Sequence, residues 1–580
     1  MNYHIEHAKY KYGCITAVGW LAGDTADVHT SVWAEDAKGI RISCETRRME
    51  REDVREALFP QETQCLFGFR IKFPAEPGKA YFLCLGDGTQ VSKCRTTSKE
   101  VQKTGSIPDN LKARLRTAIL SRKNETGQTE KSPYDTGSGI KKNQAVRRQE
   151  IRFSVAVPLY NTDHEHLADM LESVFHQTYE NWELCLADGS PVSILESCRG
   201  QEDRLSRVIE EFLTDPRVKY VHLAENRGIS GNSNEAFRLA EGDFVVMLDH
   251  DDLLEADALS QTAAVLCARP DTDFVYSDSD LTDHDGLYCY NPLYKPDWSP
   301  ETLICANYIT HLSVVRRELL MQLGGLKPEY DGAQDWDLFL RIGEATDRIC
   351  HIPKVLYHWR AAETSTALDV SLKPYAREAQ LRAVSDYLTR RGVPGRAVFV
   401  DRGSTCIRVE WQDNLPEADV VIRRQPGVEL EPEDAQELRR FASLPGMGVI
   451  GVRVVNGKGR ILSQGLLLER DGLRPLFAGS FPGTAGFLGH TDWYRDGVAS
   501  EPVCYAVSRR VWDQIGPVDE SLGDLAVIDL CLRARAAGLR NMVTPFVQVQ
   551  AKESVAQRIA ASGQGAYRKL LAKYQTGEPG

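Results

Sequence analysis

The stretch FVVMLDHDD, residues 244–252, joins a short apolar run directly to three carboxylates. An apolar run of this length is typical of a buried strand. Two earlier stretches, FSVAVPLYN at 153–161 and WELCLADGS at 182–190, repeat the pattern of a strand that ends in polar residues. We therefore expect a sheet whose strands deliver polar side chains at their ends.

Helical patterns separate these strands. Leu167, Leu171 and Val174 recur at helical spacing between the first two, and a further helix is expected from about Asn232. Strands that alternate with helices indicate a parallel sheet with right-handed crossovers. In such α/β sheets, ligands bind beyond the carboxyl ends of the strands. The sequence therefore predicts a binding site at that edge.

The acidic loop 249–252 holds three carboxylates that repel one another. A divalent cation would compensate them, and hard oxygen ligands suit Mg²⁺ or Mn²⁺. The alternative is that Asp251 or Asp252 only caps a helix beginning near Leu253. The position at the end of a strand favours the metal.

Two later segments extend the expected site. QDWDL at 334–338 opens a helix, where Asp335 is either a cap or a general base. YHWR at 357–360 follows a strand-like run, where His358 is either structural or a ligand to a metal or phosphate. Both alternatives stay open on spacing alone.

Six motifs, at 153–161, 187–190, 226–234, 248–252, 334–338 and 357–360, resemble in order those of the family 2 glycosyltransferases. The resemblance covers residues 151–392 and implies a Rossmann-like GT-A fold. It also implies inverting transfer of a sugar from UDP or dTDP, assisted by Mn²⁺ or Mg²⁺. The expected acceptor is a hydroxyl of a cell-surface polysaccharide or glycolipid precursor, that is, a saccharide or a lipid-linked saccharide.

The resemblance also assigns roles to individual residues. The nucleotide-sugar ligands are expected to be Pro158, Tyr160, Asp188, Arg227, Asn234, Asp249 and Lys295. Asp251 and His358 are expected to bind the metal, and Asp335 to act as the base. The chain departs from the family at Ala187, where an acid is frequent, and at Ser233, where an arginine is usual.

Two other functions remain as alternatives. One is a non-catalytic carbohydrate-binding scaffold built from inactive lobes. The coexistence of Asp188, Asp249, Asp251 and Asp335 in one lobe argues against it. The other is a sugar nucleotidyltransferase, which needs a glycine-rich phosphate loop where residues 158–161 read PLYN. We therefore expect an enzyme of the glycosyltransferase class.

Flanking segments differ in composition from this domain. Short strand-like runs in residues 1–100 predict a β-sandwich accessory domain. Residues 101–150 form a basic linker with a short helix at 109–122, either solvated or in contact with an anionic membrane surface. The formal net charge of −12 argues against nucleic acid as a partner.

Residues 393–580 contain an internal repeat. A shift that carries Asp337 onto Asp529 superposes residues 313–353 on 505–545 without a gap. Val527 then stands opposite Asp335, and Gln550 opposite His358. We predict a degenerate glycosyltransferase-like half-domain that serves as a docking or acceptor-positioning surface.

The fourteen cysteines form no CxxC pair, and no apolar run approaches the ~18 residues of a membrane span. Residues 1–7 are too polar for the apolar part of a signal peptide. We expect a cytoplasmic protein with reduced thiols. A peripheral position at the inner face of the cell membrane is the alternative.

Overall fold

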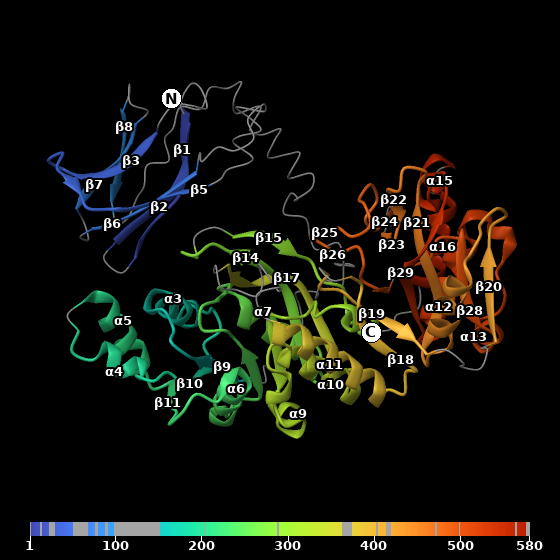
Figure 1. The fold of residues 1–580 in the computed structure, drawn as a ribbon, viewed down its shortest axis with the longest axis horizontal. Helices are drawn as coiled ribbons and strands as arrows, with labels where there is room; N and C mark the ends of the chain where they lie inside the picture. Colours follow the sequence, from blue (N-terminus) through green and yellow to red (C-terminus); the bar gives the residue numbers. More distant parts are fainter. Residues whose placement is uncertain are drawn as a thin grey trace.

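The computed structural model describes residues 2–97 except 12–13, 23–29, 50–67, 76–78 and 87–90. It also describes residues 151–575 except 202, 287–288, 362–373, 402–403, 413–418, 470–471, 498 and 563–564. The expected basic linker and its helix at 109–122 lie outside the described residues. Figure 1 shows an amino-terminal β domain in blue, a central α/β domain from teal to yellow, and a carboxy-terminal domain in orange and red.

The amino-terminal domain consists of two antiparallel sheets with strand orders β1-β2-β6-β5 and β4-β3-β7-β8. Buried side chains of both sheets, among them Ile15, Phe69 and Leu83, form one apolar core. The strands are β1 (Asn2–Lys11), β2 (Cys14–Ala22), β3 (Ser31–Asp36), β4 (Arg41–Ile42), β5 (Glu45–Met49), β6 (Gly68–Pro74), β7 (Ala80–Gly86) and β8 (Val91–Thr97).

The central sheet has the strand order β11-β10-β9-β12-β16-β14-β17-β13, with β15 beside β14. Its strands are β9 (Phe153–Leu159), β10 (Trp182–Asp188), β11 (Val218–His222), β12 (Phe244–Met247), β13 (Leu253–Leu254), β14 (Phe274–Thr282), β15 (Cys289–Leu293), β16 (Ser313–Arg316) and β17 (Ile349–Arg360). Together with the helices on both faces, this is the expected GT-A-type α/β fold.

Strand direction decides which residues meet at the binding edge. β11, β10, β9 and β12 are parallel, so their carboxyl ends lie together. β16 runs antiparallel to β12 and to β14, so its amino end reaches the same edge. β17 is parallel to β14 and ends there too. This edge of the sheet therefore holds the carboxyl ends of β9, β10, β11, β12 and β17 and the amino end of β16.

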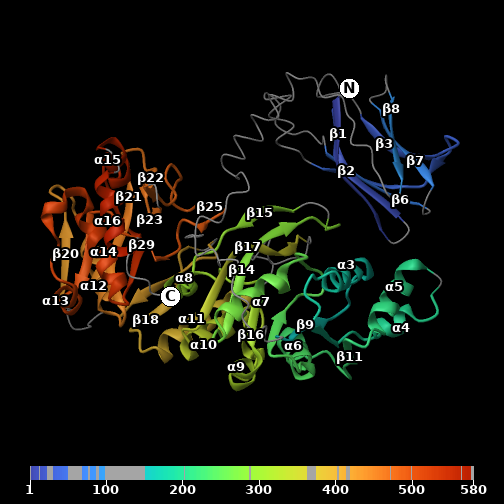
Figure 2. The ribbon, with the colours of Figure 1, turned by 180° about the vertical axis from the view of Figure 1, so that it is seen from behind.

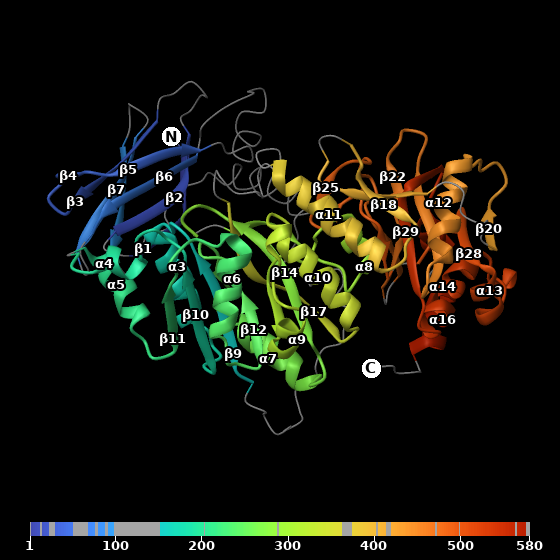
Figure 3. The ribbon, with the colours of Figure 1, turned by 60° about the horizontal axis from the view of Figure 1, so that its bottom comes forward.

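Helices cover the sheet on two faces, as Figure 3 shows from below. One face packs against α3 (His164–Phe175), α4 (Ile194–Cys198), α5 (Arg204–Leu213) and α7 (Ala258–Ala268). The other packs against α6 (Gly228–Leu239), α8 (Pro300–Cys305), α9 (Arg317–Gln322), α10 (Gln334–Ala345) and α11 (Pro374–Arg390). This second core continues into the carboxy-terminal domain.

Two sequence expectations about boundaries need correction. α6 begins at Gly228, four residues before the expected start. Leu253–Leu254 form β13, which pairs with β17, whereas the next helix, α7, begins only at Ala258. Neither Asp251 nor Asp252 is therefore the cap of a helix.

The carboxy-terminal sheet, visible from behind in Figure 2, repeats part of the central one. Its order β20-β28-β21-β29-β27, with β22 beside β21, has the same sequence of parallel and antiparallel pairs as β12-β16-β14-β17-β13 with β15. α13 (Arg509–Ile515) and α14 (Ala526–Ala536) begin at the positions that the repeat pairs with the starts of α9 and α10. The chain order agrees as well, except that β27 lies between β22 and β28 whereas β13 lies between β12 and β14. The repeat seen in the sequence is thus accompanied by the same order and directions of paired strands.

The remaining elements complete this domain. The strands are β18 (Gly395–Phe399), β19 (Ile407–Trp411), β20 (Val420–Arg424), β21 (Met447–Val455), β22 (Ile461–Ser463), β23 (Leu466–Glu469), β24 (Gly472–Pro475), β25 (Ala485–Gly486), β26 (Gly489–His490), β27 (Arg495–Asp496), β28 (Cys504–Ser508) and β29 (Arg540–Gln550). The helices are α12 (Pro432–Ser443), α15 (Val555–Ser562) and α16 (Gly565–Gln575), and 3₁₀ turns lie at Pro328–Tyr330 and Glu520–Leu525. Among the described helices, none is long and apolar enough to cross a membrane.

Candidate active site

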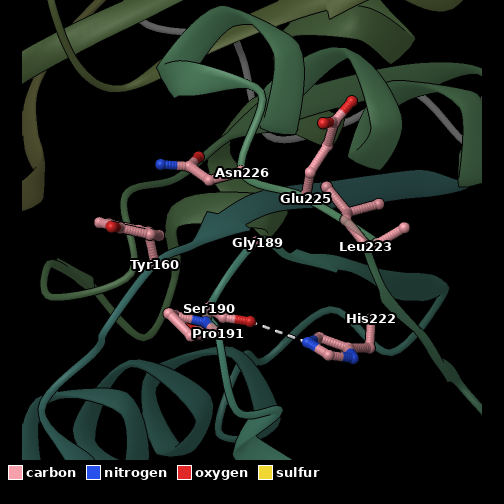
Figure 4. Close-up of a pocket in the computed structure, with 9 residues that line it drawn as sticks. Tyr160, Gly189, Ser190, Pro191, His222, Leu223, Glu225 and Asn226 are labelled. Atoms are coloured by element: carbon pink, nitrogen blue, oxygen red, sulfur yellow. Dashed lines mark hydrogen bonds between the residues drawn. The ribbon is translucent and has the colours of Figure 1, made fainter.

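A pocket of about 420 Å³ opens at the carboxyl ends of β9, β10 and β11. Tyr160, which is 44% exposed, forms one wall, and the His222 ring donates a hydrogen bond to the Ser190 carbonyl (2.8 Å) at another (Figure 4). A Cβ added at Gly189 would lie 2.6 Å from the amide of Asn232, so only glycine fits this close approach. The full lining is Tyr160, Gly189, Ser190, Pro191, His222, Leu223, Ala224, Glu225 and Asn226.

Asp188 shapes this pocket from behind. Its buried carboxylate accepts hydrogen bonds from the backbone N–H groups of Ser190 (2.9 Å) and Ile194 (2.8 Å). It also accepts the Tyr220 hydroxyl at 2.5 Å, and burial together with Asp188 raises the pKa of Tyr220. Both carboxylate oxygens are thus engaged within the protein, and Asp188 holds the loop that lines the pocket.

The acidic loop after β12 lies at the same edge. Burial and the neighbouring charge of Asp251 raise the pKa of Asp249 to about 6. Asp252 is fully buried and accepts the Tyr357 hydroxyl (2.6 Å) and the Arg360 N–H (2.7 Å), while burial raises its pKa. The Arg360 guanidinium also donates to the Asp251 carbonyl (2.5 Å). The loop is therefore held firmly although its carboxylates crowd one another.

His311, just before β16, is a site residue that sequence reasoning missed. Its Nε2 lies 3.4 Å from the Asp249 carboxylate, and its ring stacks on Tyr357 with 4.5 Å between centroids. Burial lowers the pKa of His311 to about 4, so the imidazole is neutral near pH 7. Its buried Nδ1 has no hydrogen-bond partner among the described residues. No strand-end motif pointed to it.

Asp335 lies in the first turn of α10 and faces this group. One carboxylate oxygen accepts the Trp336 N–H (2.8 Å), and the other accepts the side-chain amide of Asn307 (2.7 Å). Burial and the negative charge of Asp249 raise the pKa of Asp335. The N-cap of α10 is Ala333, so the sequence alternative of an Asp335 cap does not describe its position.

The residues at the acidic loop fit a divalent cation. Ligand atoms of Asp249, Asp252 and His311 lie within 4.8 Å of one another. Carboxylate oxygens are the ligands that Mg²⁺ and Mn²⁺ prefer, and a neutral imidazole is a further ligand for Mn²⁺. Burial and, after it, the charge of Asp251 raise the pKa of Asp249, and a cation would offset both effects.

His358 lies in a second group of possible metal ligands, together with Asp280 and Cys289 and apart from the acidic loop. Its Nδ1 lies 2.6 Å from Asp280 and 3.4 Å from the Cys289 thiol, and its Nε2 lies 3.2 Å from Glu255. Burial lowers its pKa, but these hydrogen bonds outweigh burial and raise it to about 12. Among the described residues, no hydrogen bond or ion pair joins the ring to the Asp251 carboxylate.

Two expected nucleotide-sugar ligands are engaged elsewhere. Lys295 is fully buried, and its ammonium donates to the carbonyls of Ile309 (2.6 Å) and His311. Burial lowers the pKa of Lys295 to about 7. The Asn234 amide both donates to and accepts from the backbone of Leu326 (2.7 and 2.9 Å). Both side chains thus bind backbone groups of loops, whereas the sequence expectation was that they face the nucleotide sugar.

The two other expected ligands keep positions near the pocket. Pro158 lies in the buried end of β9, in register with Ala187. Arg227 precedes α6, pairs with Glu235, and leaves about half of its side chain exposed. These positions are compatible with a role beside the pocket for Arg227 and with a purely supporting role for Pro158.

Comparison with known proteins agrees with this arrangement. Residues 154–324 match the family model "Glycosyl transferase family 2". An uncharacterized protein of Sinorhizobium fredii is 31% identical over 493 residues, which cover 70% of this chain and 53% of that one. The O-antigen biosynthesis protein RfbC of Myxococcus xanthus is 26% identical over 517 residues, 74% of this chain and 40% of that one. The chain thus spans about half the length, or less, of these relatives.

Among solved structures, the S. aureus TarS fragment in complex with UDP-GlcNAc is similar over 41% of this chain and 66% of that one, at 19% identity and a TM-score of 0.33. By its match to the family model, the segment 154–324 within the central domain is a family 2 glycosyltransferase domain.

Proposed function

We propose that residues 151–392 transfer a sugar, with inversion, from a UDP- or dTDP-sugar to a hydroxyl of a saccharide or lipid-linked saccharide. The observation that carries this proposal is the convergence of Asp249, His311 and Asp335 at the sheet edge where the pocket also opens. The name of the RfbC relative supports a surface polysaccharide precursor as the acceptor. The proposal includes peripheral contact with the cytoplasmic face of a membrane.

In this proposal each group has a part. The pocket of Tyr160, Ser190 and Asn226 receives the nucleoside. Asp335 accepts the proton of the attacking hydroxyl, and its raised pKa brings it closer to the pH at which a general base works best.

The site residues also fit a resident Mn²⁺ or Mg²⁺. Asp249, Asp252 and His311 would hold it together with Asp251, which follows Asp249 on the same loop. When bound, such a cation stabilises negative charge on a departing diphosphate. The polypeptide's own contribution is to keep the loop rigid through Tyr357 and Arg360.

A panel of sugar nucleotides tests the proposal. The full chain is assayed for nucleotide release with UDP-glucose, UDP-galactose, UDP-N-acetylglucosamine, dTDP-rhamnose and GDP-mannose, with Mn²⁺, with Mg²⁺ and with EDTA. We expect turnover with a uridine or thymidine donor that EDTA abolishes. Turnover in excess EDTA, or in Asp251→Ala, would refute the metal-assisted mechanism, and no turnover with any donor would favour the binding scaffold.

A further inference from the structure

Helix α8 belongs to the catalytic domain and packs against the carboxy-terminal half-domain, and Figure 3 shows it between the two. Asp496 accepts hydrogen bonds from the Ser299 hydroxyl (2.8 Å) and the Glu301 N–H (3.3 Å) at the start of α8. Arg540 donates to the Glu301 carboxylate at 2.8 Å. The half-domain thus forms hydrogen bonds to backbone and side-chain groups at the start of α8.

The rest of α8 is held in the same way. The Thr302 hydroxyl donates to the Tyr494 carbonyl (2.7 Å), and the Cys305 thiol to the Asp492 carbonyl (3.1 Å). Both side chains are fully buried. Because each of these buried groups would lose its partner if α8 moved, the helix follows the position of the half-domain.

The carboxyl end of α8 leads to the candidate base. Asn307, two residues beyond the helix, donates its side-chain amide to Asp335 at 2.7 Å. Trp336, whose N–H binds the other Asp335 oxygen, donates its indole N–H to the Leu303 carbonyl of α8 at 2.7 Å. Both groups that fix the Asp335 carboxylate are therefore tied to one helix.

We propose that Asn307 is a positioning residue for Asp335, and that the carboxy-terminal half-domain sets its position through α8. This inference rests on the proposed function of Asp335 as the base. A base must reach the attacking hydroxyl at hydrogen-bond distance, and a displacement of about 1 Å lowers rates by roughly 10²-fold. The degenerate copy thereby serves the active one as a mechanical support.

The test measures donor hydrolysis with the sugar nucleotide that turns over fastest in the panel, and UDP affinity by calorimetry. Asn307→Leu keeps the branching at Cγ but has no donor, and we expect kcat to fall roughly 10- to 100-fold. UDP affinity and the melting temperature should stay near the wild-type values. If this variant folds poorly, Asn307→Asp keeps the shape, and its negative charge should displace the carboxylate and give a similar loss.

A double-mutant cycle separates positioning from general support. In an Asp335→Asn background, Asn307→Leu should cost nothing further, because its effect passes through the carboxylate. Wild-type turnover in Asn307→Leu, or an equal loss in both backgrounds, would overturn the inference. Wild-type turnover in Asp335→Asn would instead refute the proposed base, so the two failures are distinguishable.

The half-domain is tested at its contact with α8. Arg540→Gln removes the donor to Glu301, and we expect kcat to fall several-fold with unchanged UDP affinity. The matched control is Arg558→Gln, which removes an ion pair to Asp524 within the same half-domain. Equal kcat values in the two variants would show that the half-domain does not act through α8.

Discussion

Residues 313–353 and 505–545, which the sequence repeat pairs without a gap, share features of the fold but differ in residues that could carry chemistry. In each copy an aspartate in the first helical turn pairs with an arginine four residues later. Arg341 also binds the carbonyls of Leu323 and Gly325, and Arg533 binds those at the equivalent Ile515 and Pro517. The aspartate–arginine pair therefore belongs to the fold.

The copies differ at the position two residues earlier. Asp335 faces the candidate site, whereas Val527 is buried in the apolar core of the second copy. α14 forms without a carboxylate there, so α10 does not need Asp335 in order to fold. The strand before the acidic loop also has a counterpart, β20, which ends in Arg423-Arg424 and not in carboxylates. The second copy thus has the same fold elements but lacks the candidate base and the carboxylates of the acidic loop.

The largest expected effect concerns Asp335 itself. Asp335→Asn should lower turnover by roughly 10²–10⁴-fold, the usual contribution of a general base, with little change in donor affinity. Steady-state kinetics and UDP calorimetry measure the two quantities. Val527→Ala at the equivalent position should leave turnover within a few-fold. If Asp335→Asn does the same, Asp335 is not the base and another carboxylate, such as Asp280, has to be tested.

The scaffold pairs should differ in their contributions to stability. Arg341→Met leaves Asp337 buried without its partner, which costs about 3–5 kcal/mol. Arg533→Met should cost less, about 1.5–3 kcal/mol, because Asp529 keeps the Tyr574 hydroxyl at 2.5 Å. Urea unfolding of both variants measures the difference, and equal losses would contradict it.

The pair of His358 and Asp280 should give a smaller, pH-dependent effect. The pKa of His358 rises from its ordinary 6.5 to about 12 on folding, mainly through hydrogen bonds that outweigh burial. Its stabilisation is therefore complete below pH 6.5 and is lost as pH rises toward 12, by about 1.4 kcal/mol per pH unit at most. Unfolding in EDTA from pH 6 to 9 should show this slope.

The matched variant is His358→Gln, which introduces the residue that Gln550 provides in the second copy. Stability in this variant should depend less on pH over the same range. An unchanged slope would show that His358 is not the group that titrates.

The smallest effect is expected for nucleotide binding by the second copy. Calorimetry with UDP should find one site per chain, and Asp529→Ala should lower stability without changing UDP affinity. Asp529 is buried and bound to Arg533 and Tyr574, so its removal disturbs packing. A stoichiometry of two would show that the carboxy-terminal half-domain retains a nucleotide site.

Sequence patterns led to the fold and to part of the site. The strand-end rule selected Tyr160 and Asp249 because the parallel strands β9 and β12 do end at one edge. It missed His311, which precedes β16, because a strand running the other way brings its start to that edge. Strand direction depends on pairing between distant segments, and a single run of residues does not record it.

The motif match also named residues whose side chains turn out to be occupied. Lys295 and His358 are charged residues beside family motifs, yet one binds buried carbonyls and the other two carboxylates. Neighbouring strand residues point to opposite faces, so Tyr357 reaches His311 while His358 reaches Asp280. A motif lists residue types but does not say which face each one takes.

The sequence by itself determined the alternation of strands and helices, the acidic loop and the internal repeat, because apolar period and residue identity are local properties. Only the tertiary structure decided that His311 joins Asp249 and Asp335, and that α8 ties the degenerate half-domain to the candidate base. These contacts join segments far apart in the chain. Their geometry depends on how the sheet and its covering helices pack against each other, and no local sequence pattern encodes this packing.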